Sequence, residues 1–76
     1  MKNNQKIKQI ERELNKRAQH LNQSVKVSLT EIGNVKISTN DCYISGGMLD
    51  IITNYAKQNH YDYFISFSNN CIFLHR

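Results

Sequence analysis

Apolar residues recur at two different spacings along this chain, and each change of spacing marks the boundary of a predicted element. Across residues 3–22 the spacing is three or four, at Ile7, Ile10, Leu14, Ala18 and Leu21. This spacing is typical of one face of an amphipathic helix. Across residues 25–44 apolar and polar residues alternate, which predicts a hairpin with a turn at residues 31–34 and leaves open a short third strand at 42–44.

The second half of the chain repeats this order. Helical spacing predicts an amphipathic helix over residues 46–59, with Ser45 or Gly47 as its N-cap. Alternation then predicts a second hairpin over residues 62–75, in which Asn69-Asn70 forms a two-residue turn. The core face of this hairpin would hold Tyr63, Ile65, Phe67, Ile72 and Leu74. The opposite face would hold Phe64, Ser66, Cys71, Phe73 and His75.

The predicted order is therefore helix, hairpin, helix, hairpin. Antiparallel hairpins with helices on one side form a two-layer α+β domain with an antiparallel sheet. The chain has 76 residues, which is enough for one domain over residues 1–76. A chain of this length buries only about 60% of its unfolded surface, so we expect a small core.

The charged residues are unevenly distributed along the chain, and this distribution bears on function. The chain has 10 Lys and Arg residues against 6 Asp and Glu, a net charge of +4. All of the excess lies in residues 1–30, whose charged side chains are Lys2, Lys6, Lys8, Glu11, Arg12, Glu13, Lys16, Arg17 and Lys26. Such an asymmetry indicates an anionic partner, or a helix with one face in solvent.

Three of these cations, Lys8, Arg12 and Lys16, form an i, i+4 row on the predicted helix, opposite its apolar stripe. We call these three residues the basic ridge. The functional interpretation is contact with phosphate groups, to which Arg17 would contribute. The alternative is a solvated face that keeps a small protein in solution.

The outer face of the second hairpin carries the other candidate binding residues, Phe64, Phe73 and His75. Exposed rings near positive charge can stack on unpaired bases, and they can equally anchor a protein partner. The alternative is that the first helix packs across this face and covers both rings. A further alternative is that the apolar stripe of the first helix pairs with a second copy, as in a coiled coil.

The remaining side chains predict no catalytic or metal site. Cys42 and Cys71 are expected to be free thiols, and with His60 and His75 they lack the spacing of a zinc site. The acidic residues form no evident pair, and a domain this small has little room for a closed pocket. We therefore expect a non-enzymatic protein with no cofactor. The polar N-terminus lacks a secretory signal, and no apolar stretch is long enough to span a membrane, which predicts a cytoplasmic protein.

In size and layout the chain resembles the small inhibitor proteins of phages and mobile elements, including anti-CRISPR proteins. The features that carry this resemblance are the charged helix Lys6–Leu21, the amphipathic helix Met48–Asn59 and the final hairpin Tyr63–His75. Anti-CRISPR proteins share no common fold or motif, so the resemblance assigns no functional residue.

Two function hypotheses follow. In the first, which the resemblance implies, the chain is a non-catalytic inhibitor that blocks a bacterial nucleic-acid-handling complex by steric and electrostatic occlusion. Its partner would be a protein or ribonucleoprotein complex. In the second, the chain is a stand-alone nucleic-acid-binding module that uses its basic helix to contact RNA or DNA. The oligomeric state, monomer or dimer, is left open by the sequence.

Overall fold

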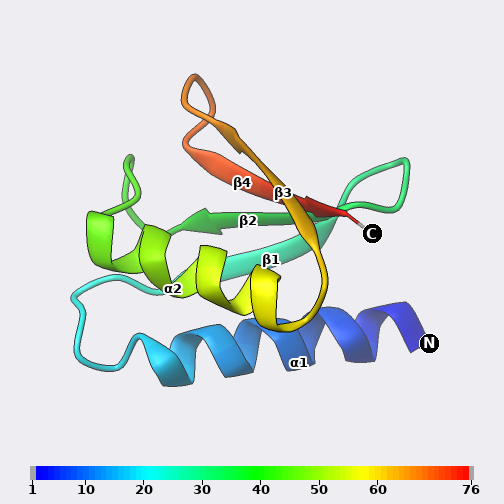
Figure 1. Cartoon of the computed structure of the whole chain (residues 1–76), viewed down its shortest axis with the longest axis horizontal. Helices are drawn as coiled ribbons and strands as arrows, with labels where there is room; N and C mark the ends of the chain where they lie inside the picture. The colour runs from blue at the N-terminus through cyan, green and yellow to red at the C-terminus, as the bar shows by residue number, and fades with distance from the viewer. Residues whose placement is uncertain (1, 76) are drawn as a thin grey trace.

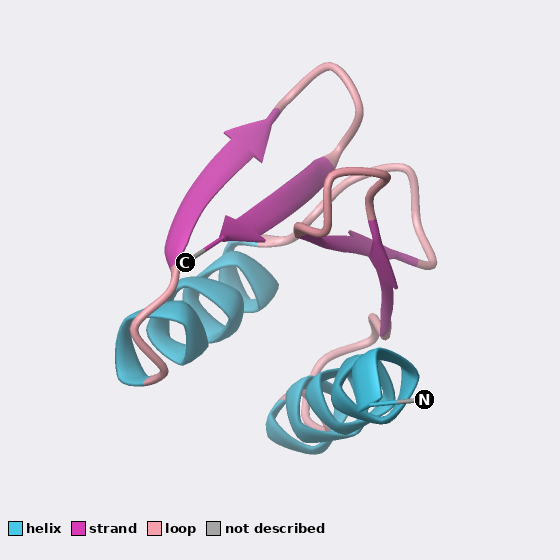
Figure 2. Cartoon of the chain, turned by 90° about the vertical axis from the view of Figure 1, so that its right-hand side faces the viewer, coloured by secondary structure: helices cyan, strands magenta, loops and turns pink. Residues whose placement is uncertain are grey.

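The computed structural model describes residues 2–75, with side chains from residue 5 onward, and has the predicted order of elements. These are α1 (Lys2–Arg17), β1 (Val25–Leu29), β2 (Val35–Thr39), α2 (Gly46–Gln58), β3 (Asp62–Ser66) and β4 (Cys71–His75). The strands form one antiparallel sheet in the order β1-β2-β4-β3. Both helices lie on the same face of this sheet (Figures 1 and 2). The predicted α+β fold class is confirmed.

The apolar stripe of α1 packs into the core of the domain. Ile10, Leu14 and Ala18 are buried in the main hydrophobic cluster, and Leu21 packs against it. This burial makes the coiled-coil interpretation of the stripe wrong, because the stripe is already occupied within one chain. The helix also ends at Arg17 rather than at residue 22. The chain tightens into a turn there, in which Leu21 N donates to Ala18 O at 2.9 Å.

Polar side chains of α1 bind the free edge of β1. Asn15 makes two hydrogen bonds to the Val25 backbone: its Oδ1 accepts from Val25 N at 2.8 Å, and its Nδ2 donates to Val25 O at 3.3 Å. Glu11 Oε1 accepts from Val27 N at 2.8 Å. The first half of the outer edge of β1, which would otherwise be a template for another strand, is thereby paired.

Both ends of α2 follow from local chemistry. Ser45 is the N-cap, since its hydroxyl accepts from Met48 N at 3.2 Å. At the other end Asn59 is the C-cap and His60 adopts a φ of 62°. Tyr61 N then donates to Ala56 O at 2.8 Å, which is the long hydrogen bond of a Schellman motif. The predicted helix at 46–59 is confirmed to within one residue.

A single amide, that of Gln23, organises the loop between β2 and α2. Its Nε2 donates to Asp41 Oδ2 at 3.0 Å and to Tyr43 O at 2.9 Å, and its Oε1 accepts from Ser45 N at 3.0 Å. Thr39 Oγ1 also donates to Tyr43 O, at 2.7 Å. Side chains therefore bind the backbone of this loop, and residues 41–43 form bends in place of the third strand that the sequence left open at 42–44.

The second hairpin differs from its prediction in the length of its turn. The turn has four residues, 67–70, rather than the two predicted, and Asn70 adopts a φ of 51° within it. Ser66 therefore lies opposite Cys71, and Phe64 opposite Phe73. Phe67, predicted to be core, stands in the turn with 81% of its surface exposed. Ile72 and Leu74 are fully buried as predicted, and Ile65 packs partly buried against the core.

Candidate binding surface

One face of the sheet is left without a helix in the described part of the chain (Figure 2). Its residues follow from the strand registers, because side chains alternate between the two faces of a strand. One row across the four strands runs Ser28, Lys36, Phe73, Phe64, and the next row runs Lys26, Ser38, Cys71, Ser66. We call these two rows the open sheet face.

The two phenylalanines form a stacked pair on this face. Their ring centroids are 6.4 Å apart with an interplanar angle of 29°. Phe64 is 62% exposed, while Phe73, in a central strand, is half-buried. The alternative in which α1 covers both rings is wrong, because α1 packs on the opposite face of the sheet. The four-residue turn sets the pairing, since it places the two rings directly opposite each other.

Cys71 is the one member of the open sheet face that is fully buried. It does not belong to the main hydrophobic cluster, in agreement with its place on the other face of β4. Its small thiol lies in a central strand, between Ser38 and Ser66 of the strands on either side. The sequence placed Cys71 on this face, as the structure does, but because the side chain is buried it offers no thiol to a ligand.

His75 lies at the end of the same face. It is exposed and pairs in register with Asp62 of β3. Along β4 it is two residues from Phe73, so the two side chains share a face. The structure thus brings together three of the candidate residues predicted from the sequence: Phe64, Phe73 and His75.

Two lysines extend the open sheet face toward α1. Lys36 is exposed and lies directly beside Phe73 in register, and Lys26 is exposed on the neighbouring row. Neither lysine is among the candidate site residues predicted from the sequence. The alternation of β1 and β2 could have placed both on the outer face, but the sequence does not show that β2 pairs with β4.

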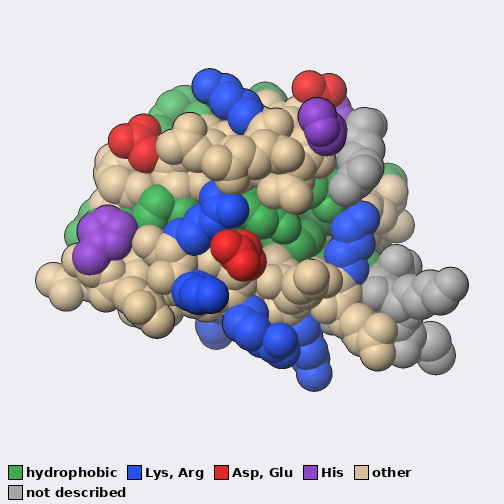
Figure 3. Space-filling model, turned by 60° about the horizontal axis from the view of Figure 1, so that its bottom comes forward, with side chains coloured by type: hydrophobic (Ala, Val, Ile, Leu, Met, Phe, Trp, Pro, Cys, Tyr) green, Lys and Arg blue, Asp and Glu red, His purple; other side chains and the backbone are tan. Residues whose placement is uncertain are grey.

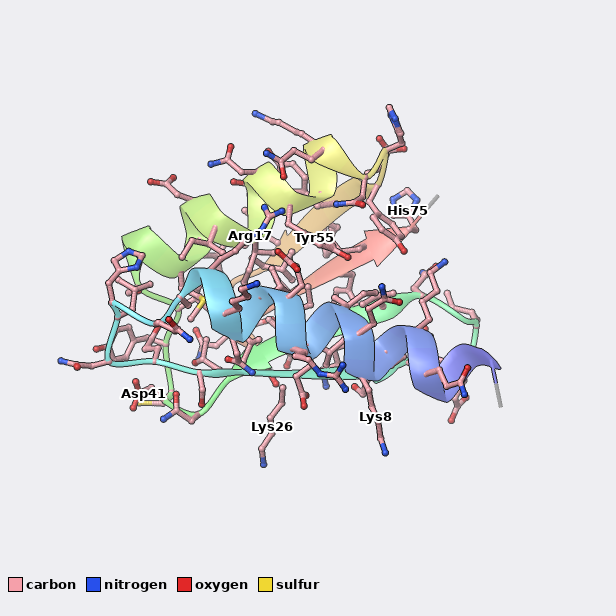
Figure 4. All side chains as sticks on the ribbon, turned by 90° about the horizontal axis from the view of Figure 1, so that it is seen from below. Lys8, Arg17, Lys26, Asp41, Tyr55 and His75 are labelled. Atoms are coloured by element: carbon pink, nitrogen blue, oxygen red, sulfur yellow. The ribbon has the colours of Figure 1, made fainter. Side chains whose placement is uncertain are left out.

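The basic ridge lies beyond the outer edge of β1. Lys8, Arg12 and Lys16 are all exposed, and together with Gln19 they line a shallow hollow on α1. Basic side chains gather over α1 (Figure 3), and Lys8 projects to the same side of the molecule as Lys26 (Figure 4). The ridge therefore continues the cationic part of the open sheet face rather than standing apart from it.

Arg17 points away from the basic ridge, toward α2. Its Nε bonds Glu13 Oε2 at 2.9 Å, and its Nη1 donates to Gln58 Oε1 at 2.8 Å. Its guanidinium carbon lies 5.3 Å from the centre of the Tyr55 ring (Figure 4). These contacts hold the two helices together. The structure therefore separates Arg17 from the other candidate residues.

The side chains considered for metal binding remain apart. Cys42 is exposed and Cys71 is buried, and both thiols are free. Among the described residues no three His, Cys, Asp or Glu side chains are placed to hold a metal ion. Within the same residues, neither helix has the length and apolar character that crossing a bilayer requires.

Comparisons of the chain with protein-family models, with curated proteins and with solved structures found no match.

Proposed function

We propose that this protein is a non-catalytic binding protein that holds single-stranded nucleic acid on its open sheet face. The observation that carries the proposal is the stacked pair formed by exposed Phe64 and half-buried Phe73, which lies beside Lys36 on a face that neither described helix covers. Aromatic rings on such a face accept unpaired bases, because every base has a flat apolar surface that stacks regardless of sequence.

The charges beside the rings supply the second half of the interaction. Lys36 and Lys26 lie on the same face as the rings, and the basic ridge follows beyond the edge of β1. A strand whose bases stack on Phe64 and Phe73 would direct its phosphates across β2 and β1 toward α1. Binding of phosphates by lysine and arginine releases counterions, so the affinity would fall as salt rises.

The geometry favours a single strand over a duplex. In a duplex the faces of the bases are stacked on one another and cannot reach a protein ring. A surface that uses ring faces therefore selects unpaired nucleotides, whereas a surface made only of cations would bind both forms.

The inhibitor predicted from the sequence would act through this same surface. By holding a single strand, or the groove of a complex that carries one, the protein would exclude the complex from its target. This role stays a prediction, as does the non-enzymatic interpretation. It is tested by mixing the protein with guide–effector complexes and measuring co-elution and loss of target binding.

Fluorescence anisotropy with labelled oligonucleotides tests the proposal directly. We expect single strands of about 12 nucleotides to bind more tightly than a duplex of the same sequence. Between about 50 and 200 mM salt, the logarithm of the affinity should fall linearly, with a slope near −0.7 for each phosphate contacted. Absence of binding at the lowest salt, or a preference for the duplex, would overturn the proposal.

A further inference from the structure

The two edges of the sheet differ in how their backbone groups are satisfied. In an antiparallel strand the N–H and C=O of one residue point to the same side, and this side alternates along the strand. At the β1 edge, the backbone groups of Val25 and Val27 point outward and bind α1. The same alternation can be followed through the registers of β2 and β4 to β3. There the backbone groups of Tyr63 and Ile65 point outward, away from β4.

The β3 edge also lacks the side chains that usually protect an edge strand. Natural edges carry lysines, prolines or bulges that discourage pairing with another chain. Between Asp62 and Ser66 the strand is continuous and reads Tyr63-Phe64-Ile65, without a charge. Among the described residues, no strand lies on the outer side of β3.

We propose that β3 pairs antiparallel with β3 of a second copy of this chain, on a two-fold axis at Phe64. This inference does not depend on the proposed function. With the axis at Phe64, the outward backbone groups of Tyr63 meet those of Ile65 in the second copy, in both directions. The free donors and acceptors of the two edges are then matched to each other.

The side chains are self-complementary in this register. Asp62 lies opposite Ser66 of the second copy, so no like charges face each other across the interface. Tyr63, which is 39% exposed on the helix face, would lie across from Ile65 of the second copy. Beside Ile65 is a hollow of about 130 Å³ whose lining includes the apolar side chains of Ile44 and Leu49. The ring of Tyr63 fits the chemistry of that hollow.

The pairing would join the two open sheet faces into one. The row Ser28, Lys36, Phe73, Phe64 would continue into Phe64, Phe73, Lys36 and Ser28 of the second copy. Four rings would stand in the middle of this row, with Lys36 of each copy next to them on either side. The second copy would therefore extend the same surface rather than cover it.

Sedimentation velocity of the nucleic-acid-free protein tests this pairing, at protein concentrations from micromolar to several hundred micromolar. Two variants of Ser66 introduce charges of opposite sign at the same position. Ser66→Lys places a cation opposite Asp62 of the second copy, and Ser66→Glu places a carboxylate there. We expect the dimer dissociation constant to fall about tenfold with lysine and to rise about tenfold with glutamate, because each pair occurs twice. The double variant Asp62→Lys/Ser66→Glu should restore the dimer.

The matched control is Ser28, which lies on the same outer face, exposed, but on β1. Ser28→Lys and Ser28→Glu should leave the dissociation constant unchanged to within about twofold. A wild-type chain that sediments as a monomer of 8.9 kDa throughout the range would overturn the inference. So would equal dissociation constants for the two Ser66 variants, because the dimer would then use another surface.

Discussion

Asn15 and Val25 are joined by two hydrogen bonds, so that one helical side chain binds both backbone groups of an edge residue. Asn15 lies beside the basic ridge and lines the same hollow, but its amide is bound to the backbone of β1. Together with Glu11 it attaches α1 to β1 along the edge of the sheet.

Replacing Asn15 by Ala removes both bonds and leaves two polar groups of a buried strand residue without partners. We expect the free energy of unfolding to fall by about 1–3 kcal/mol. Alanine is the better helix former by at most about 0.7 kcal/mol, so the lost bonds decide the sign. Urea unfolding followed by circular dichroism measures the change.

The matched control is Asn54→Ala, which makes the same replacement at an exposed position of α2. Here only helix propensity changes, and we expect a gain of up to about 0.7 kcal/mol. Loss of stability at Asn54, or no loss at Asn15, would contradict the assignment of the edge contact.

Periodicity was sufficient to predict the fold class, because burial imposes a different spacing on helices and on strands. It could not locate the end of α1, since Leu21 continues the apolar stripe after the backbone has left the helix. It also missed the four-residue turn after Ser66. Asn69-Asn70 is a good two-residue turn by composition, and both registers keep Ile72 and Leu74 on the core face, so the alternation of side chains alone does not distinguish them.

The sequence predicted most residues of the candidate site singly, but not their arrangement on one surface. Phe64, Phe73 and the basic ridge each stand out locally, by exposure of alternate residues or by helical spacing. The link between them is Lys36, whose place beside Phe73 depends on the pairing of β2 with β4. Those strands are far apart in the sequence, and nothing local specifies which strands pair. The side chain of Arg17 points toward α2, and this direction depends in the same way on where α2 packs.

Phe64→Thr tests the aromatic part of the site while keeping a residue that favours strands. If bases stack on this ring, the variant should lose about tenfold or more in affinity for single strands, since stacking is worth about 1–3 kcal/mol per base. The loss should be similar at each salt concentration, because no charge changes. Anisotropy titrations provide the measurement.

Phe67→Thr is the control for exposed aromatic surface in general. Phe67 is the more exposed ring, but it lies in the turn rather than on the open sheet face. Its replacement should change the affinity by less than about twofold. An equal loss at Phe67 would show that the turn, and not the sheet, carries the binding.

Lysine replacements test the path of the phosphates. Lys36→Gln and Lys26→Gln should each weaken binding and reduce the steepness of the salt dependence by about 0.7, the share of one phosphate on a single strand. Replacing Lys8, Arg12 and Lys16 together by Gln should reduce the steepness further, by up to about 2.

Lys57→Gln is the matched control for net charge. Lys57 is exposed on α2, which lies on the other side of the sheet from the proposed ligand. Its removal should leave the salt dependence unchanged. If Lys57→Gln reduces the salt dependence as much as Lys36→Gln does, the affinity reflects the total charge of the protein and not a defined surface.

His60 offers a test of the backbone that is independent of binding. It holds a φ of 62° after α2, where an L-residue with a side chain costs about 1–2 kcal/mol and glycine does not. Because the side chain is exposed, His60→Gly should raise the free energy of unfolding by about 1 kcal/mol, after the entropy cost of glycine is subtracted.

His20→Gly is the control. His20 is exposed in the turn after α1 but does not have a positive φ, so glycine there should lower stability by a few tenths of a kcal/mol or more. Thermal and urea unfolding of the two variants should therefore shift in opposite directions, and a loss of stability at His60 would mean that the Schellman motif does not form in solution.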